Sequence, residues 1–523
     1  MRLIKLLQRY PAWSIICLLA PFLFIGAIVI LPTHDDWFSL VSPSQEPFFT
    51  KERFLFYGYH WRPFDSIFGY IVGLNHRLLF PTLNHISVII GHICCTWLVY
   101  SISGLLRFNK TARNIATLFY FIAPATLATI FAVDGLNQTY SNLWGMAALF
   151  IYIKGIRIQE VPRVQGVQGV QGVTINTQHI KYSLFILFVI ISTLCKENGI
   201  SWAFITPIMA YGFNMCDRKI LIRDFLLGIV IVITYAAAII LLPSNIIIEQ
   251  EYVPTIGKIA TNIIKYIFTS WITVDYVYLL HQPSMNIIIA LITFILTVPF
   301  FYIILRRQED RRKGRQDSPL FGRGVGGEAP KKVVLTLFVC QIIAVGPHLG
   351  TVFSMMHTYA GHCFTAFIIA YLINRIKTPL SMGKGLRVRL LWKAFALYII
   401  SALFIDIHIW YTSYESGIMG RDMITQIIEK TNGTPKRVRC INIADNYPKL
   451  SSFRVIPFEA IGWGYAIKYY TDYKWPETLV SEEINNFPTA FDEAKILARY
   501  YLKNNTCDCV WIINHQDITV INK

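Results

Sequence analysis

Two adjacent acids follow the first apolar run of the chain and are the first candidates for chemistry. The run ends near Leu31, and Asp35 and Asp36 come soon after it. Because like charges disfavour joint ionisation, one of two neighbouring carboxyls holds its proton more tightly than usual. Such a pair can remove a proton from an acceptor hydroxyl, or it can bind a cation. A solvated loop with a helix-capping Asp is the structural alternative.

A Lys-Glu pair lies at the end of a later apolar run. Lys196 and Glu197 separate two hydrophobic stretches and are followed by Asn198 and Gly199. Ionisable groups at the edge of a membrane span are functional candidates, and a lysine can neutralise a phosphate as a compact point charge. A tight surface turn with a mutual ion pair is the alternative for this motif.

Histidines form a third group of candidates. They are His76, His85, His92, His348, His357 and His362. The chain has neither HExxH nor HxxxH spacing, and its ten cysteines form no CxxC pair, so we expect no metal site. It also has no GxxxxGK[ST] motif and no GxSxG motif, which argues against nucleotide hydrolysis and serine-hydrolase chemistry.

The composition predicts a polytopic membrane protein around these residues. Of 523 residues, 54% are hydrophobic and only 15% are charged, whereas soluble domains have about 25% charged residues. The formal net charge of +17 comes from short basic runs between apolar stretches, as expected of loops held on the cytoplasmic side. The pattern excludes an ordinary cytosolic enzyme, and we expect no nucleic acid as a partner.

Apolar windows of about 20 residues predict about eleven transmembrane helices. The windows are 13–31, 83–106, 113–133, 139–154, 181–195, 199–215, 224–243, 285–305, 334–355, 361–375 and 391–409. Basic residues before the first window place the N-terminus in the cytoplasm, and the window is read as an uncleaved anchor. The first outer loop is then 33–81, and 155–180 and 306–333 are cytoplasmic loops.

Two segments are predicted separately from these windows. Residues 259–280 are apolar enough to span, yet they include Lys265 and Asp275 and lie between two cytoplasmic basic loops. We therefore expect an interfacial helix or a re-entrant segment there. Val164–Gly172 repeats VQG three times, and this composition is typical of a flexible connector.

The chain is predicted to divide into a transmembrane domain, 1–410, and a C-terminal domain, 411–523. The odd number of crossings places the second domain outside the cytoplasm. Its β-like runs at 438–443 (VRCINI) and 509–513 (CVWII) predict a small α+β core. Two of Cys440, Cys507 and Cys509 could form a disulfide, but the sequence does not determine which two.

The order of these motifs resembles the GT-C superfamily of membrane glycosyltransferases. The match is to the dolichyl-phosphate-mannose protein O-mannosyltransferases, in particular the branch that has tetratricopeptide repeats. The matching positions are Asp35-Asp36, Arg62-Pro63, His85, His92, Lys196-Glu197, Asn262, Tyr266 and Leu279-Leu280-His281-Gln282-Pro283. The resemblance covers residues 1–375, and the fold it implies is a GT-C arrangement of transmembrane helices.

The chain departs from this family pattern in three places. The third-span motif lacks its acidic residue and its arginine, and the corresponding positions are Pro124, Ala128, Gly135 and Leu136, with Asp134 beside them. A late Glu-Arg-Tyr element is replaced by Met356-His357-Thr358-Tyr359. No tetratricopeptide array follows. These departures leave the donor sugar and protein mannosylation open.

The resemblance implies an inverting hexosyltransferase with a polyprenyl-phosphate-linked sugar as donor and a protein, lipid or glycan as acceptor. Asp35 or Asp36 would be the base, and Lys196 with Arg62 would bind the donor phosphate. The supporting residues would be Glu197, His85, His92 and His357. We expect neither a metal nor another cofactor, and we place the active site at the outer face of a bacterial inner membrane, in contact with membrane lipid.

Three other functions compete with this interpretation. A transporter or flippase of lipid-linked sugars would favour ionisable groups within spans and an internal repeat. A polysaccharide polymerase or ligase would use related donors but is expected to have a large late outer loop. A non-enzymatic assembly or sensor protein would make the acidic pair incidental.

Overall fold

The structure is a computed structural model of the chain. It describes residues 11–37, 62–64, 67–68, 84–159, 169–241, 254–272, 287–288, 291, 330–351, 353–375, 385–435, 437–443, 460–472, 474–475, 480–482, 490–514 and 517–523.

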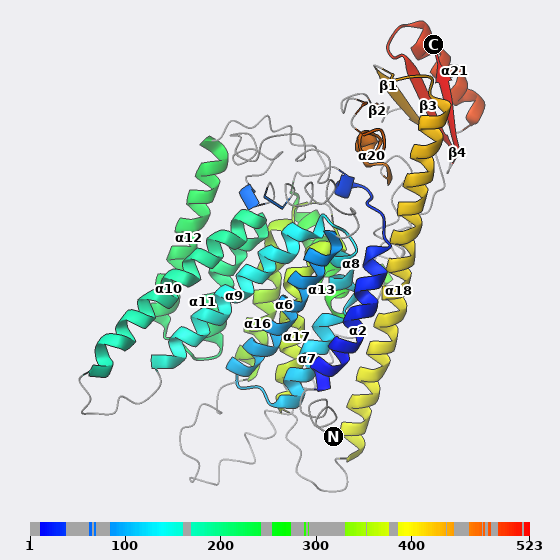
Figure 1. Cartoon of the computed structure of the whole chain (residues 1–523). Helices are drawn as coiled ribbons and strands as arrows, with labels where there is room; N and C mark the ends of the chain where they lie inside the picture. Colours follow the sequence, from blue (N-terminus) through cyan, green and yellow to red (C-terminus); the bar gives the residue numbers. More distant parts are fainter. Residues whose placement is uncertain are drawn as a thin grey trace.

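A bundle of helices makes up most of the described chain (Figure 1). Its helices are α2 (Pro11–Ile28), α6 (His85–Leu105), α7 (Lys110–Phe121), α8 (Pro124–Ile130), α9 (Gly135–Gln159), α10 (Gly169–Cys195), α11 (Trp202–Gly212), α12 (Arg218–Leu241), α13 (Ile256–Trp271), α16 (Pro330–Val345), α17 (Thr358–Arg375) and α18 (Gly385–Lys430). Five of the described helices are long and apolar enough to cross a membrane. The mostly helical, multi-pass architecture is therefore confirmed. The number of crossings stays a prediction, since most of the window 285–305 lies outside the described residues.

In the described chain, three short 3-10 helices lie between bundle helices, and two of them bear predicted site residues, Glu197 and His357. They are η3 (Glu197–Ser201), η5 (Gly346–His348) and η6 (Met355–His357). η3 contacts η5, and η6 contacts both α8 and α9. Segments that are distant in the sequence are thus brought together between the helix ends.

Aromatic packing fixes the position of η3. Trp202, the first residue of α11, is 1% exposed, and its ring centroid lies 5.7 Å from that of Phe364 on α17. The indole fits because α9 has Gly145 opposite it, where an added Cβ would lie 2.0 Å from the Trp202 ring. Large buried rings contribute strongly to packing energy, so this contact holds the helix that directly follows the Lys196-Glu197 turn.

The long helix α18 connects the bundle to the C-terminal domain (Figure 1). Within the bundle it packs on α2, where the Trp410 indole N–H donates a 2.9 Å hydrogen bond to the Gly26 carbonyl. Gly417 allows a close approach, because an added Cβ would lie 2.9 Å from the Leu31 carbonyl oxygen. α18 therefore fixes the C-terminal domain at the end of the bundle where the chain leaves α2.

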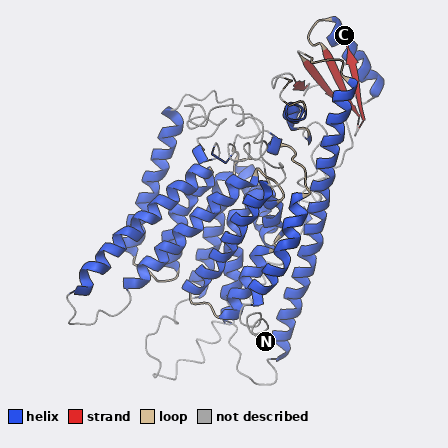
Figure 2. Ribbon diagram, in the orientation of Figure 1, coloured by secondary structure: helices blue, strands red, loops and turns tan. Residues whose placement is uncertain are grey.

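The C-terminal domain contains one four-stranded sheet (Figure 2). Its strands are β1 (Val438–Asn442), β2 (Val480–Glu482), β3 (Cys509–Asn514) and β4 (Asp517–Asn522), in the order β2-β1-β3-β4. β1 is parallel to β2 and β3, and β3 is antiparallel to β4. The strands predicted at 438–443 and 509–513 are confirmed.

Helices cover both faces of this sheet. Alternate residues of a strand point to opposite faces, so Val510 and Ile512 pack with α21 (Phe491–Lys503), whereas Trp511 and Ile513 pack in the cluster that contains α18. The three cysteines that could have formed a disulfide, Cys440, Cys507 and Cys509, are free thiols. The domain is therefore held by apolar packing.

Two predicted segments differ from the structure. The window 113–133 is not one helix, because α7 ends at Phe121 and α8 begins at Pro124. Proline has no N–H for the helical hydrogen bonds, so the chain breaks before it. The VQG repeat was predicted to be flexible, yet α10 begins at Gly169 within it. Packing of α10 along α9 extends the helix beyond its apolar window, because tertiary contacts supply most helical stability.

The predicted boundary between the two domains falls inside a continuous helix. α18 runs from Gly385 to Lys430 without a break, so residues 410 and 411 are neighbours on one helix. The division at this position stays a prediction.

We expect Gly145→Ala to destabilise the bundle by about 1–3 kcal/mol, since overpacking a filled core costs about that much. The measurement is thermal unfolding of the purified protein in detergent. Gly257→Ala is the matched control, because no atom lies within 4 Å of its added Cβ and alanine favours a helix by about 1 kcal/mol over glycine. Equal melting temperatures for the two variants would contradict the proposed fit of Trp202.

Candidate functional site

Asp36 ties the loop after α2 to the loop between α8 and α9. Its side chain is 3% exposed. One carboxyl oxygen accepts a 2.8 Å hydrogen bond from the Asp134 backbone N–H, and the other accepts a 3.3 Å bond from the Thr33 backbone N–H. Both oxygens are thus held by main-chain donors, which gives this acid a fixed position.

The main electrostatic neighbour of Asp36 is Asp134 rather than Asp35. Burial raises the pKa of Asp36 to about 7, with a further contribution from the Asp134 carboxylate and a smaller one from Asp35, while the two backbone N–H donors oppose the rise. The sequence singled out Asp35 and Asp36 as a mutually perturbing pair. The tertiary structure adds Asp134, which lies 98 positions further along the chain.

Asp35 is the accessible acid of this group. Its side chain is 48% exposed, and its carboxylate lies 3.1 Å from Nδ1 of His34. His34 has a positive φ of 48°, an uncommon conformation in which histidine is enriched. The turn that follows leaves Asp35 exposed and Asp36 buried.

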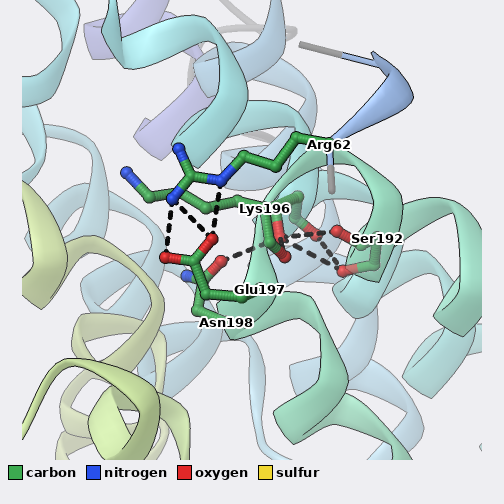
Figure 3. Close-up of polar contacts among 6 residues, drawn as sticks. Arg62, Ser192, Lys196, Glu197 and Asn198 are labelled. Carbon is green, nitrogen blue, oxygen red and sulfur yellow. Dashed lines mark hydrogen bonds and ion pairs between the residues drawn. The ribbon is translucent and has the colours of Figure 1, made fainter. Parts of the chain in front are cut away.

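Serine hydroxyls hold the Lys196-Glu197 turn (Figure 3), and a glycine allows its close packing. The Ser141 hydroxyl donates to the Ser192 carbonyl at 2.9 Å and contacts the Asn198 side-chain oxygen at 3.0 Å. An added Cβ at Gly199 would lie 2.2 Å from the Ser192 backbone, so only glycine permits this close approach. The turn is therefore a rigid support for the charged side chains that it presents.

Arg62 and Glu197 form a bidentate ion pair (Figure 3). The Arg62 Nε and Nη2 atoms each donate a 2.7 Å hydrogen bond to a different oxygen of Glu197. Charge-assisted, two-point pairs of this kind are strong and geometrically specific. Lys196 is 6% exposed in the adjacent position. We call Arg62, Lys196 and Glu197 the basic cluster. Its two cations and one anion give it one net positive charge.

Two histidines stack against each other beside the basic cluster. The rings of His348 and His357 are nearly parallel, with centroids 3.7 Å apart, and His357 interacts electrostatically with Lys196, Glu197 and Arg62. The single N–H of a neutral imidazole can donate a hydrogen bond to an anion.

α13 supports the histidine pair from the side. The Tyr266 hydroxyl lies 3.3 Å from Nδ1 of His357. One turn earlier on the same helix face, the Asn262 amide donates 2.9 Å hydrogen bonds to the carbonyls of Leu349 and Thr351. The Asn-x-x-x-Tyr spacing therefore holds the segment between η5 and η6.

η6 lies beside the basic cluster. Met355 is buried in the same apolar cluster as Trp37 and Val133. Trp37 directly follows Asp36 in the chain, and Val133 directly precedes Asp134. His357, two residues further, stacks on His348. η6 thus lies next to the basic cluster and packs in the apolar cluster that contains the chain neighbours of Asp36 and Asp134.

His85 and His92 lie apart from these charges, inside the bundle. The His85 Nδ1 atom lies 3.1 Å from the Ile130 carbonyl. The His92 Nδ1 atom lies 2.9 Å from the Tyr359 hydroxyl, and its Nε2 atom lies 3.1 Å from the Phe121 carbonyl. These contacts connect α6 to the break between α7 and α8 and to α17, so both histidines support the scaffold of the site.

The part of the chain that the structure describes contains no group of three or more His, Cys, Asp or Glu residues arranged to hold a metal ion. Asp134, Ser141 and Asn198 were not among the predicted site residues. Two of them had a signal in the sequence: Asp134 lies beside the altered third-span motif, and Asn198 directly follows the Lys-Glu pair.

No protein-family model and no curated protein sequence matches the chain. Three solved structures are similar to it. The apo oligosaccharyltransferase of Archaeoglobus fulgidus is 12% identical, with 96% of this chain and 69% of that chain covered and a TM-score of 0.47. The same protein tethered to an acceptor peptide with the NVT sequon is also 12% identical. That comparison covers 87% of this chain and 65% of that chain, with a TM-score of 0.42.

The third structure is apo ArnT from Cupriavidus metallidurans. It is 10% identical to this chain, with 99% of this chain and 98% of that chain covered and a TM-score of 0.47. Because all three TM-scores lie below 0.5, we base the function on the geometry of the site.

The buried Asp36 predicts that stability decreases as the pH rises. Its pKa is 3.8 in the unfolded chain and about 7 in the folded protein. Between these values the folded protein binds the extra proton, so the free energy of unfolding falls with rising pH. The free energy of unfolding falls by at most about 4 kcal/mol in all, since one pKa unit corresponds to about 1.36 kcal/mol.

Thermal unfolding in detergent between pH 4 and pH 8 measures this effect. We expect Asp36→Asn to flatten the decline, whereas Asp492→Asn, at a 90% exposed side chain, should keep it. The same slope in wild type and Asp36→Asn would exclude Asp36 as its source.

Proposed function

We propose that the protein is a GT-C membrane glycosyltransferase that moves a sugar from a polyprenyl-phosphate donor to an acceptor hydroxyl. The combination of an exposed acid, Asp35, with a partly buried basic cluster, Lys196 with Arg62 and Glu197, supports this most directly. The basic cluster lies beside His357 of η6, and η6 packs in the same apolar cluster as Trp37. Proton removal and charge neutralisation are the two tasks of such a transfer.

In the proposed reaction, the acceptor oxygen attacks the anomeric carbon of the donor sugar. The bond from this carbon to the phosphate oxygen breaks as the new carbon–oxygen bond forms, which inverts the configuration. Asp35 takes the proton of the acceptor hydroxyl. Asp36 positions Asp35 through its two backbone hydrogen bonds.

The leaving group is the polyprenyl phosphate, whose charge becomes more negative as the bond breaks. Lys196 and Arg62 offset this developing charge, and Glu197 holds Arg62 in a fixed orientation. His357 and its partner His348 supply imidazole N–H donors beside the same phosphate. Preorganised groups of this kind stabilise a transition state without reorganisation.

The net charge of the basic cluster favours a monophosphate-linked donor. A sugar phosphodiester has one negative charge, which matches the single net positive charge of Lys196, Arg62 and Glu197. A pyrophosphate-linked donor would bring further negative charge that the described residues of the cluster do not balance. A metal ion is accordingly not required by the proposal.

The charge distribution supports an outer active site. The helix ends opposite the site bear the basic residues Arg107, Lys110, Arg113, Lys154, Arg218, Lys219 and Arg223. Basic loops are retained in the cytoplasm. We therefore place the N-terminus in the cytoplasm, and the site and the C-terminal domain outside it, in a bacterial inner membrane.

The direct experiment incubates the purified protein with radiolabelled polyprenyl-phosphate sugars and, in parallel, polyprenyl-pyrophosphate sugars. Release of polyprenyl phosphate with a monophosphate donor is the expected result. Release from neither donor class would refute the proposed function.

We expect Asp35→Asn to reduce kcat by about 10²–10⁴-fold, the usual contribution of a positioned base, while the protein remains folded. Steady-state transfer kinetics measure the change. Asp492→Asn, an exposed acid on α21, is the control and should retain full activity. Wild-type kcat in Asp35→Asn would remove Asp35 as the base.

A second variant separates donor binding from chemistry. Lys196→Ala should raise KM for the donor at least tenfold, since a hydrogen bond to a charged group contributes about 1.5–3 kcal/mol. Lys474→Ala, at an exposed lysine of the C-terminal domain, should leave donor KM unchanged. Unchanged donor KM in Lys196→Ala would indicate that Lys196 only shapes the turn.

A further inference from the structure

An aromatic cluster joins the loop after α2 to the C-terminal domain. It consists of Trp37, Tyr469 and Tyr470, the two tyrosines ending α20 (Tyr465–Tyr470). The Trp37 ring centroid lies 5.4 Å from that of Tyr469 and 5.7 Å from that of Tyr470. The two tyrosine rings are 5.3 Å apart in an edge arrangement. The three rings therefore support one another as a rigid unit.

A glycine allows this contact. Gly462 has a positive φ of 56°, and an added Cβ would lie 2.6 Å from Cβ of Trp37 and 3.1 Å from the His34 carbonyl oxygen. Non-glycine residues rarely adopt such a φ. The chain before α20 is thus shaped to receive the segment that contains Asp35.

Tyr470 has an exposed surface among charged side chains. It is 37% exposed, whereas Trp37 is 2% exposed. Its hydroxyl interacts electrostatically with Arg421 and Asp422 of α18, which form an exposed ion pair at 2.9 Å. Asp35 and His34, which shortly precede Trp37 in the chain, are also accessible. The exposed ring of Tyr470 thus lies near one planar donor, Arg421, and one planar acceptor, Asp422.

We propose that the exposed Tyr470, with Arg421 and Asp422, binds a carbohydrate acceptor and directs one of its hydroxyls toward Asp35. This inference rests on the proposed function and specifies its acceptor class. One face of a sugar ring presents C–H groups, which pack on an aromatic ring, and the rim presents hydroxyls. Carboxylates accept and guanidinium groups donate hydrogen bonds to such hydroxyls.

The surroundings favour a polar acceptor over an apolar one. In the described part of the chain that follows α18, the exposed large hydrophobic residues are Tyr470, Ile496 and Tyr500. Ile496 and Tyr500 belong to α21, which packs on β3. Around Tyr470, a lipid chain or an apolar peptide would therefore find an aromatic ring beside the charged groups of Arg421 and Asp422.

The test measures acceptor binding by the full-length protein in detergent, without donor, by saturation-transfer NMR. The probes are tetrasaccharides of mannose, glucose, galactose and N-acetylglucosamine, a soluble Ser/Thr-rich peptide, and a short polyprenol. We expect at least one tetrasaccharide to bind, and Tyr470→Ala to weaken its binding about tenfold, in line with about 1.4 kcal/mol for an aromatic contact.

Two further variants control for general effects. Tyr470→Phe keeps the ring and should retain most of the binding, and Tyr500→Ala, at a 60% exposed tyrosine, should bind as wild type does. Equal binding by wild type and Tyr470→Ala, or binding of only the peptide or the polyprenol, would overturn the inference.

A transfer assay with the same acceptors separates the two proposals. Loss of binding should appear as a higher acceptor KM in Tyr470→Ala rather than as a lower kcat. If tetrasaccharides bind but no donor releases its lipid phosphate, the proposed function fails and the carbohydrate site stands. If donors react but no tetrasaccharide binds or accepts sugar, the acceptor inference alone fails.

Discussion

The arrangement of the site depends on the hydrogen bonds of the buried Asp36 carboxyl. One bond reaches the backbone of Asp134 and the other the backbone of Thr33. A buried polar group without partners would cost several kcal/mol, so these bonds fix where the chain lies after α2. They set the exposed position of Asp35 and the buried position of Trp37. The groups proposed for base catalysis and acceptor binding are consequently held by one carboxyl.

The basic cluster is organised by a different constraint, the need to pair buried charge. Arg62 reaches Glu197 from a segment 135 positions earlier in the chain. The two side chains are 14% and 23% exposed, so loss of one partner would leave the other charge poorly solvated and without its ion pair. The pair is supported by a turn whose backbone approaches Ser192 so closely that Gly199 is required. A surplus of positive charge next to a rigid turn is a suitable environment for one phosphodiester.

The C-terminal domain packs against the loop that bears Asp35. α18 fixes the sheet on α2 through Trp410 and Gly417, and α20 packs on Trp37. These contacts tie the position of the domain to the loop that bears Asp35. Its mixed sheet, covered by helices on both faces, provides a stable support for α20 and its tyrosines.

The sequence alone determined the membrane class, the helical architecture and the two strands at 438–443 and 509–513, because hydropathy and β-propensity are local properties. It also indicated the acids and the Lys-Glu turn, since charges beside apolar runs are conspicuous. It did not predict the break before Pro124 or the helix that begins at Gly169 within the VQG repeat.

Only the tertiary structure decided which of the site residues are neighbours. Asp36 with Asp134, Arg62 with Glu197, and Trp37 with Tyr470 are pairs of residues far apart in the chain. No short-range pattern encodes such pairs, because the packing of helices and the satisfaction of buried polar groups select them together.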